Sequence, residues 1–266
     1  MKIAFIGGGN MAEAILSSIL VKGLANAGEI TVSEVVESKR ASLKQKYQVV
    51  VTDSNVEAVK NKDIIVLAVK PQIFSEVAPH LKGQLKPDQL VISILAGKSI
   101  NTLSSGLAHD CIVRSMPNTP AQIGEGMTVW TATPQVLPRQ KTWAASVLGV
   151  MGLEICVDDE KYLDMATAVS GSGPAYVFLW VEAMIEAAVK LGFTPEVAQR
   201  LVMQTLLGSA HLLQKSGKAP AELRRMVTSP GGTTAEAIAT FEKGGFNPLV
   251  AQAVTAAYEK AKKLGS

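Results

Sequence analysis

Short apolar runs alternate with segments of helical spacing along the first part of the chain. Lys2 to Ile6 has the length of a strand and leads through three glycines into apolar positions that recur at helical spacing between Ile15 and Leu20. Further β-rich apolar runs follow at Glu29 to Ser33, Tyr47 to Val51, Asp63 to Val69, Leu90 to Leu95 and Cys111 to Arg114. This alternation predicts an α/β fold with a Rossmann-like, doubly wound and mostly parallel sheet.

The pattern changes in the second part of the chain. Gly126 to Ala132 and Glu154 to Val157 would add edge strands around a helix near Gln140 to Leu148, and past residue 160 we expect helices only. The expected helices are Ala175 to Leu191, Thr194 toward Gly217, Pro220 to Val227, Thr233 to Phe241 and Asn247 to Leu264. We therefore predict a dinucleotide-binding domain at residues 1–158 and an all-helical C-terminal domain at residues 159–266.

Composition and charge narrow the class of protein. With 266 residues, of which 47% are hydrophobic, the chain can bury a sizeable core. Its 26 basic and 23 acidic residues are spread along the sequence, so nucleic acid is not an expected partner. The helical half has more apolar surface than its own helices would hide, so we expect an oligomer. Glu182 and Glu186 would lie in the middle of the most apolar helix, which favours an interface or buried helix over a membrane span.

Residues typical of metal sites and of nucleophilic catalysis are few and scattered. The two cysteines, Cys111 and Cys156, lack metal-ligand spacing and are too few for a disulfide framework, so we expect buried thiols in a reducing compartment. His80, His109 and His211 fall outside the motifs described below, and we expect surface or core roles for them. No metal site is predicted, and no Gly-x-Ser-x-Gly turn supports a serine hydrolase. The first predicted strand begins at residue 2 and leaves no room for a signal peptide, so we expect a cytoplasmic protein.

The turn after the first strand is the first candidate site. Gly7 and Gly9 allow backbone angles that a side chain forbids, and Gly9 lets a pyrophosphate approach the main chain. Ala12 is small enough for the helix to pack closely on the strand, and the phosphates would bind at the N-terminus of that helix. We therefore predict nucleotide binding here, against the alternative of a glycine turn needed only for packing.

Ligands of such sheets bind beyond the carboxyl ends of the strands, so the segments that follow the strands are further candidates. One strand leads into Lys70-Pro71, another into Ala96-Gly97, and a third into Ser115 to Pro120. Small residues and prolines there would fix loops beside a flat cofactor ring. The alternatives are a solvated cation for Lys70 and simple turn rigidity for the prolines.

Glu34 follows the second strand, where an acidic residue usually binds the ribose hydroxyls and repels a 2′-phosphate. This interpretation favours NADH. Lys39 and Arg40 lie nearby and would instead serve the 2′-phosphate of NADPH. A surface glutamate in a loop is the third possibility, so the preference between the two cofactors stays open.

The last quarter of the chain indicates a second anion site. Ser229-Pro230-Gly231-Gly232 forms a turn, after which Thr233 and Thr234 open a helix whose N-terminus attracts a carboxylate. The hydroxyls of Ser229, Thr233 and Thr234 would bind a small acid and leave one donor for the reacting atom. The alternative is a helix cap after a proline-glycine turn, with no role in binding.

Five motifs occur in the order found in pyrroline-5-carboxylate reductases, and the chain resembles that family from end to end. The motifs are Phe5 to Ala12, Ala68 to Pro71, Arg114 to Pro120, Ser170 to Tyr176 and Thr228 to Thr234. The last is the most specific, whereas the first is shared with many dehydrogenases. The resemblance implies reduction of the cyclic imine Δ1-pyrroline-5-carboxylate to L-proline by NADPH or NADH, the last step of proline biosynthesis. It also implies an intertwined homodimer of the helical domains, often assembled further into a decamer as a pentamer of dimers, with each active site at the dimer interface.

The same resemblance implies roles for individual residues. The threonine matching Thr234 hydrogen-bonds the substrate nitrogen and assists its protonation, and Glu160 matches an acidic residue at the substrate site. Residues that match the turn around the substrate carboxylate are Ser229, Gly232 and Thr233. Positions that match the cofactor lining are Gly7, Gly9, Asn10, Met11, Ala12, Asn55, Ala68, Val69, Lys70, Leu95 and Ala96. The reasoning on strand ends adds Glu34 and Pro71 to this cofactor set.

The sequence departs from the family pattern at a few positions, and two other functions stay open. Glu34 stands where NADPH-preferring members often carry a small polar residue, and Met226 where some relatives have asparagine; Ile94-Leu95 is bulkier than the usual small pair. A β-hydroxyacid dehydrogenase would need a lysine near the start of the long helix, and Ser172 to Val177 contains none. A redox-sensing NAD(P)-binding regulator would not need the substrate turn at Ser229 to Thr234, which is intact.

Overall fold

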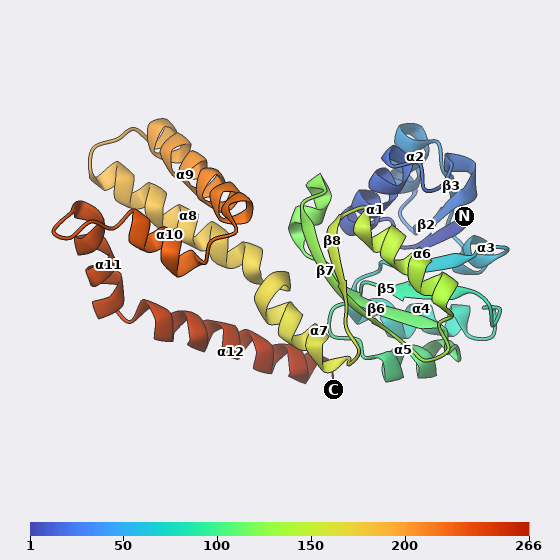
Figure 1. Cartoon of the computed structure of the whole chain (residues 1–266). Coiled ribbons are helices and arrows are strands. Elements are labelled where there is room, and N and C mark those ends of the chain that lie inside the picture. The colour runs from blue at the N-terminus through green and yellow to red at the C-terminus, as the bar shows by residue number, and fades with distance from the viewer. Residues whose placement is uncertain (266) are drawn as a thin grey trace. The chain divides into compact units, whose positions relative to one another are not determined.

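A computed structural model describes residues 1–265, whose contacts divide them into two compact units (Figure 1). Unit 1 comprises Met1–Pro174 together with the residues from Ala256 onward, and unit 2 comprises Ala175–Thr255. The contacts thus divide the two units after Pro174. The domain boundary predicted at residue 158 instead lies just after the last strand, which ends at Cys156.

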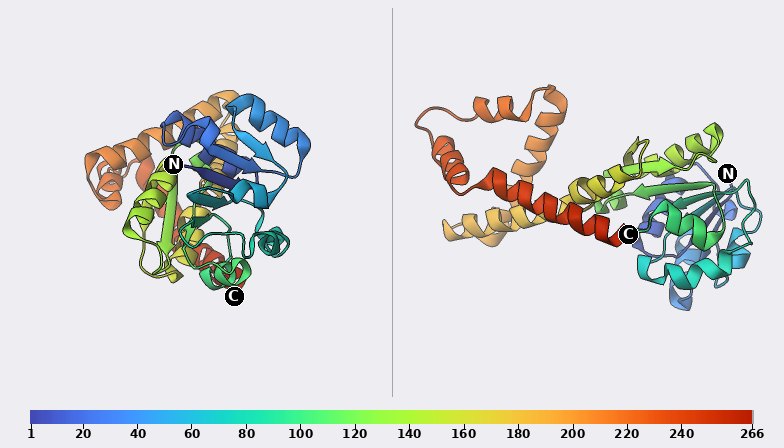
Figure 2. Two further views of the ribbon diagram at one scale, coloured as in Figure 1. Left: turned by 90° about the vertical axis from the view of Figure 1, so that its right-hand side faces the viewer. Right: turned by 90° about the horizontal axis from the view of Figure 1, so that it is seen from below.

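Unit 1 contains a sheet of 8 strands in the order β3-β2-β1-β4-β5-β6-β7-β8, side by side in the left view of Figure 2. The strands are β1 (Ile3–Ile6), β2 (Ile30–Ser33), β3 (Val50–Thr52), β4 (Ile64–Leu67), β5 (Leu90–Ser93), β6 (Ile112–Met116), β7 (Gly126–Ala132) and β8 (Gly152–Cys156). The first six pair in parallel, β7 runs antiparallel to β6, and β8 runs parallel to β7. The predicted doubly wound, mostly parallel sheet is confirmed, and the strand order reverses between β1 and β4.

Helices pack on both faces of this sheet because alternate strand residues point to opposite faces. In β1, Ile3 and Phe5 belong to one buried cluster and Ala4 and Ile6 to the other. The first cluster also takes residues from α1 (Asn10–Val21), α2 (Glu37–Tyr47) and α6 (Pro138–Gly149). The second takes residues from α3 (Asn55–Val59), α4 (Phe74–Leu81) and α5 (Ile100–Leu107). Burial on both faces explains why the strands appear in the sequence as continuous apolar runs.

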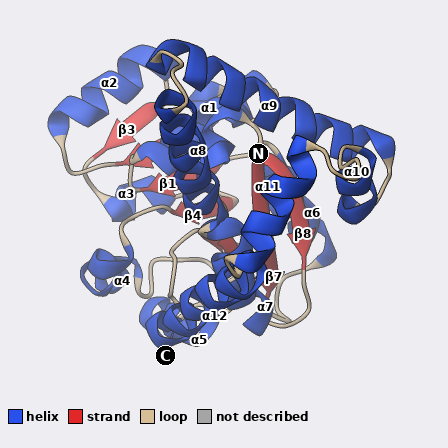
Figure 3. Cartoon of the chain, turned by 90° about the vertical axis from the view of Figure 1, so that its left-hand side faces the viewer, coloured by secondary structure: helices blue, strands red, loops and turns tan. Residues whose placement is uncertain are grey.

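Beyond β8 the described chain is helical, as expected (Figure 3). The helices are α7 (Lys161–Ala166), α8 (Gly173–Lys190), α9 (Pro195–Ser216), α10 (Pro220–Met226), α11 (Thr233–Lys243) and α12 (Phe246–Gly265). Thr194 caps α9 by accepting a hydrogen bond from the Val197 amide, which confirms the helix start predicted from Thr194-Pro195. Unit 2 contains most of these helices and exposes large apolar side chains such as Phe178, Leu179 and Leu249.

Two local expectations are wrong. Tyr47 ends α2 rather than beginning a strand, and Gln48 then leaves the helix with a positive φ of 57°. A π-helical turn at Thr167–Gly171 continues α7 toward α8, a feature that the sequence did not indicate. Cys111 is buried as expected, whereas Cys156 is exposed. Both thiols are free.

Candidate functional site

The glycine turn after β1 has the shape of a phosphate cradle. Gly7 has a φ of +98°, and a Cβ at this position would lie 2.8 Å from the carbonyl oxygen of Ala68. A Cβ at Gly9, by contrast, would project into open space in front of α1. Gly7 is therefore required by the fold of the turn. Gly9 has an ordinary φ of −74°, so the expectation of a special backbone angle is wrong there, and its lack of a side chain instead leaves room for a ligand beside the main chain. The turn fits a pyrophosphate at the N-terminus of α1.

The first residues of α1 support this fit. Asn10 opens the helix and is exposed, Met11 is half-buried, and Ala12 is buried against the sheet. Glu13 brings a negative charge into the first turn, but its carboxylate lies 2.8 Å from the Lys46 ammonium and also accepts a hydrogen bond from the Tyr47 hydroxyl. The hydrogen bond from Lys46 is the main cause of a lowered pKa of Glu13. This cation offsets the repulsion that Glu13 would exert on a bound phosphate.

The other predicted cofactor residues follow strand ends that lie level with one another. Ile6 is in register with Ser33 and with Leu67, and Leu67 is in register with Ser93. Ser33 is also in register with Thr52, the last residue of β3. The chain beyond these strand ends brings the following residues to this edge: Glu34, Asn55, Ala68, Val69, Lys70, Pro71, Leu95 and Ala96. The sequence-based prediction that the strand exits share one edge of the sheet is thus confirmed.

Individual contacts hold this edge in place. The hydroxyl of Ser33 donates to the side-chain oxygen of Asn55 over 2.7 Å, which ties β2 to the start of α3. The amide of Leu95 donates to the Ser93 hydroxyl over 3.3 Å, and the Leu95 side chain is buried. Lys70 precedes a short 3₁₀ helix that starts at Pro71, and its side chain is exposed. The exposed Lys70 is compatible with both interpretations given to it above.

Glu34 is buried rather than a surface residue in a loop. Its Oε2 accepts a hydrogen bond from the amide of Gly8 over 3.0 Å, and its Oε1 accepts one from the amide of Val36 over 3.0 Å. Arg40 donates from Nη1 to the carbonyl oxygens of Glu34 and Val35, at 2.7 Å and 2.9 Å. Glu34 and Arg40 therefore both lie at the end of β2, and a contact of either with the ribose stays a prediction.

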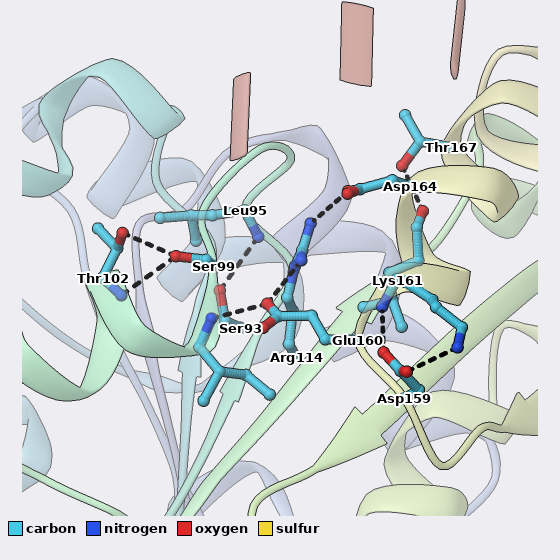
Figure 4. A network of polar contacts seen from close by, with 12 residues as sticks. Ser93, Leu95, Ser99, Thr102, Arg114, Asp159, Glu160, Lys161, Asp164 and Thr167 are labelled. Atoms are coloured by element: carbon cyan, nitrogen blue, oxygen red, sulfur yellow. Dashed lines mark hydrogen bonds and ion pairs between the residues drawn. The ribbon is translucent and has the colours of Figure 1, made fainter. Parts of the chain in front are cut away.

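A polar network occupies the adjoining ends of β5, β6 and α7 (Figure 4). Arg114 donates from Nη1 to Oε1 of Glu160 over 2.6 Å and from Nη2 to Oδ1 of Asp164 over 3.2 Å. Asp159 pairs with Lys161 at 2.9 Å beside this network, and a hydrogen bond from the Lys161 amide is the main cause of a lowered pKa of Asp159. The sequence indicated Glu160 only through a family resemblance and gave no role to Asp164.

The predicted substrate turn lies in unit 2. The amide of Gly232 donates to the carbonyl of Ser229 over 3.1 Å, and Gly231 between them has a positive φ of 69°. α11 then begins at Thr233, as predicted. Ser229 and Thr233 are exposed and Thr234 is half-buried. Within residues 1–265 no side chain caps the start of α11, so its first amides are available to an anion.

Comparison with known proteins identifies the family. A family model described as pyrroline-5-carboxylate reductase dimerisation matches residues 160–264, and one described as NADP oxidoreductase, coenzyme F420-dependent, matches residues 2–97. The pyrroline-5-carboxylate reductase of Pseudomonas aeruginosa is 43% identical over 99% of this chain and 96% of its own length. The chain belongs to the pyrroline-5-carboxylate reductase family.

Solved structures of this family agree with the fold. A pyrroline-5-carboxylate reductase from Coxiella burnetii has a TM-score of 0.93 and 40% identity, covering 100% of this chain and 98% of its own. The pyrroline carboxylate reductase of Plasmodium falciparum, solved with NADP bound, has a TM-score of 0.90 and 34% identity with the same coverage. The Rossmann-like domain followed by a helical dimerisation domain is therefore the fold of this family.

Residues 1–265 contain neither a metal-binding cluster nor a membrane-spanning helix. No group of three or more His, Cys, Asp and Glu side chains is arranged to hold a metal ion. None of the helices combines the length and apolar character needed to cross a bilayer. His109 is buried with a ring nitrogen 2.8 Å from the carbonyl of Gln89, and His80 and His211 are exposed. These are the core and surface positions expected for the histidines.

Proposed function

We propose that the protein reduces Δ1-pyrroline-5-carboxylate to L-proline with NADPH or NADH, the last step of proline biosynthesis. The single observation that carries this proposal is the full-length similarity to pyrroline-5-carboxylate reductases, at 43% identity for the Pseudomonas aeruginosa relative. The glycine cradle at the edge of the sheet and the open N-terminus of α11 support it on physical grounds.

The cofactor binds at the carboxyl edge of the sheet in unit 1. A nicotinamide dinucleotide supplies the hydride when bound. Gly7 and Gly9 hold the turn open for the pyrophosphate at the start of α1, and Asn10, Met11 and Ala12 form the helix end that receives it. The remaining lining consists of Glu34, Asn55, Ala68, Val69, Lys70, Pro71, Leu95 and Ala96. The NADP bound in the structure of the Plasmodium falciparum relative supports a nicotinamide cofactor without deciding between its two forms.

The substrate binds at the turn before α11. Ser229, Gly232 and Thr233 hold its carboxylate, because the amides and hydroxyls there offer donors at a helix N-terminus. Thr234 is the catalytic residue, and its hydroxyl hydrogen-bonds the ring nitrogen as that atom gains its proton. The imine is already activated, so positioning supplies most of the rate and little acid–base power is needed. The assignment of Glu160 to the substrate site rests on the family resemblance alone.

The protein acts as a homodimer. The match of residues 160–264 to a dimerisation family and the exposed apolar side chains of α8 and α12, among them Leu179 and Leu249, support self-association. Assembly into a decamer of five dimers and a location in the cytoplasm belong to the same proposal.

The decisive measurement is the oxidation of NADH and of NADPH, in parallel, by purified protein on addition of pyrroline-5-carboxylate. We expect loss of the reduced nicotinamide absorbance with at least one cofactor and L-proline as the product. Folded protein that binds cofactor but oxidises neither would refute the reductase proposal. That result would favour a redox-sensing regulator or a different substrate.

A further inference from the structure

Arg114 is a buried cation at the carboxyl end of β6. Its side chain is 5% exposed, and its two terminal nitrogens contact the carboxylates of Glu160 and Asp164 (Figure 4). A buried guanidinium needs such partners, because removal of either side of a buried pair leaves an uncompensated charge. The sequence of β6 is otherwise apolar up to this residue, so Arg114 is placed there at a cost in desolvation.

Glu160 connects this cation to a second element. The same Oε1 that lies 2.6 Å from Arg114 accepts a hydrogen bond from the Ile100 amide over 2.7 Å. Ile100 is the first residue of α5, so the carboxylate also lies at a helix N-terminus, where negative charge is favoured. One carboxylate oxygen therefore joins β6 to the start of α5.

The chain between β5 and α5, residues 94–99, is held at both ends by this arrangement. At its start, the Ser115 hydroxyl donates to the carbonyl of Ser93 over 2.9 Å, and the Ser93 hydroxyl accepts from the Leu95 amide. At its end, Glu160 holds the Ile100 amide. In the middle, Gly97 has a φ of +68° and lies so close to Leu264 that a Cβ would be 2.8 Å from the Leu264 Cβ.

This segment carries Leu95 and Ala96, two of the proposed cofactor-lining residues. We propose that Arg114 and Glu160 are a positioning pair that fixes residues 94–99 in the shape required for cofactor binding. Glu160 then acts on the cofactor through the Ile100 amide, instead of through a direct contact with the substrate. The inference rests on the proposed cofactor site and assigns a role to Arg114 that the proposed reaction does not use.

The test measures NADPH binding without the imine substrate, by fluorescence titration of purified full-length variants. Glu160→Ala removes the carboxylate that accepts from the Ile100 amide, so residues 94–99 lose their support at one end. The Kd for NADPH should therefore rise about tenfold. Glu160→Gln keeps an oxygen that accepts from both Arg114 and Ile100, so its Kd should stay within about twofold of the wild type. Asp159→Asn is the matched control, because Asp159 neighbours Glu160 but pairs with the exposed Lys161.

Hydrogen exchange followed by mass spectrometry supplies a readout that does not depend on activity. Glu160→Ala and Arg114→Lys should both speed exchange in peptides covering residues 94–100, while Asp159→Asn should not. Comparison of Glu160→Gln with Glu160→Ala remains decisive if Arg114 variants do not fold, since both changes keep Arg114 and its ion pair with Asp164.

The possible results separate this inference from the proposed reaction. Glu160→Ala that binds NADPH as the wild type does, but has a raised KM for the imine, would overturn the positioning role and favour a substrate contact. Wild-type protein that binds NADPH without reducing the imine would refute the reaction and leave the positioning role supported by the variant Kd values. Wild-type protein that binds neither NADPH nor NADH would overturn the cofactor site and this inference with it.

Discussion

The carboxylate of Glu34 accepts a hydrogen bond from the backbone amide of Gly8 over 3.0 Å, although the two residues are 26 positions apart. The acid at the end of β2 therefore supports the glycine turn directly. A carboxylate has more acceptor positions than the amides of Gly8 and Val36 occupy, so it can still receive ribose hydroxyls. In the proposed cofactor site, its charge would repel a 2′-phosphate.

Replacing Glu34 with serine should shift the cofactor preference toward NADPH. Removal of the negative charge relieves repulsion of the 2′-phosphate, and Arg40 remains at the loop carbonyls beside it. We expect the ratio of kcat/KM for NADPH to that for NADH to rise about tenfold, the equivalent of 1.4 kcal/mol. Glu34→Gln, which removes the charge but keeps an acceptor for Gly8, separates the electrostatic effect from support of the turn. Unchanged ratios in both variants would show that Glu34 does not discriminate between the cofactors.

Alanine substitutions at Gly7 and at Gly9 should have different consequences. Gly7→Ala places a methyl group 2.8 Å from the Ala68 carbonyl at a φ of +98°, so it should lower the free energy of unfolding by about 1–3 kcal/mol. Gly9→Ala meets nothing within 4 Å and should leave stability unchanged while weakening NADPH binding. Thermal unfolding and a binding titration on each variant measure the two effects. If Gly9→Ala binds NADPH as tightly as the wild type, the pyrophosphate does not bind beside Gly9.

These elements also show what can be read from the sequence. The strands were predictable because burial on both faces makes them continuous apolar runs, and the helix starts because Thr194-Pro195 and Gly232-Thr233 carry their own signals. The hydrogen bonds that join Arg114, Glu160 and Ile100 were not predictable, because they connect residues up to 60 positions apart and one donor is a main-chain amide. The π-helical turn at Thr167–Gly171 was not predicted either, because it ends in a serine and a glycine, which are typical of loops.

The exposed thiol of Cys156 should alkylate slowly at neutral pH. Although the residue is exposed, desolvation by neighbouring protein atoms raises the pKa of this thiol above its ordinary value, so less thiolate is present at neutral pH than in a free cysteine. We expect the rate of iodoacetamide labelling, followed by mass spectrometry, to be lower than that of a cysteine-containing peptide at pH 7 and to rise as the pH increases past the raised pKa. Labelling at the rate of the peptide throughout would contradict the raised pKa.

A charge on the apolar surface of unit 2 should abolish self-association. Leu179 on α8 is 67% exposed in the single chain, and burial of a glutamate in an interface carries a large desolvation cost. Leu179→Glu should therefore shift the protein from dimer to monomer in analytical ultracentrifugation. Gln45→Glu adds the same charge to an exposed residue of α2 in unit 1 and should leave the dimer intact. A dimer that survives Leu179→Glu would show that this part of α8 lies outside the interface.

Thr234 should be the residue of the substrate turn on which the rate depends most. Its hydroxyl is proposed to hydrogen-bond the ring nitrogen in the transition state, so Thr234→Ala should lower kcat about 100-fold. NADPH binding should not change, because Thr234 is not one of the proposed cofactor-lining residues. Thr240→Ala is the matched control on the same helix, since the Thr240 hydroxyl is already bonded to the Glu236 carbonyl at 2.9 Å. If Thr234→Ala has the same kcat as the Thr240→Ala control, Thr234 is not catalytic. Binding of the substrate carboxylate would then be the function of this turn.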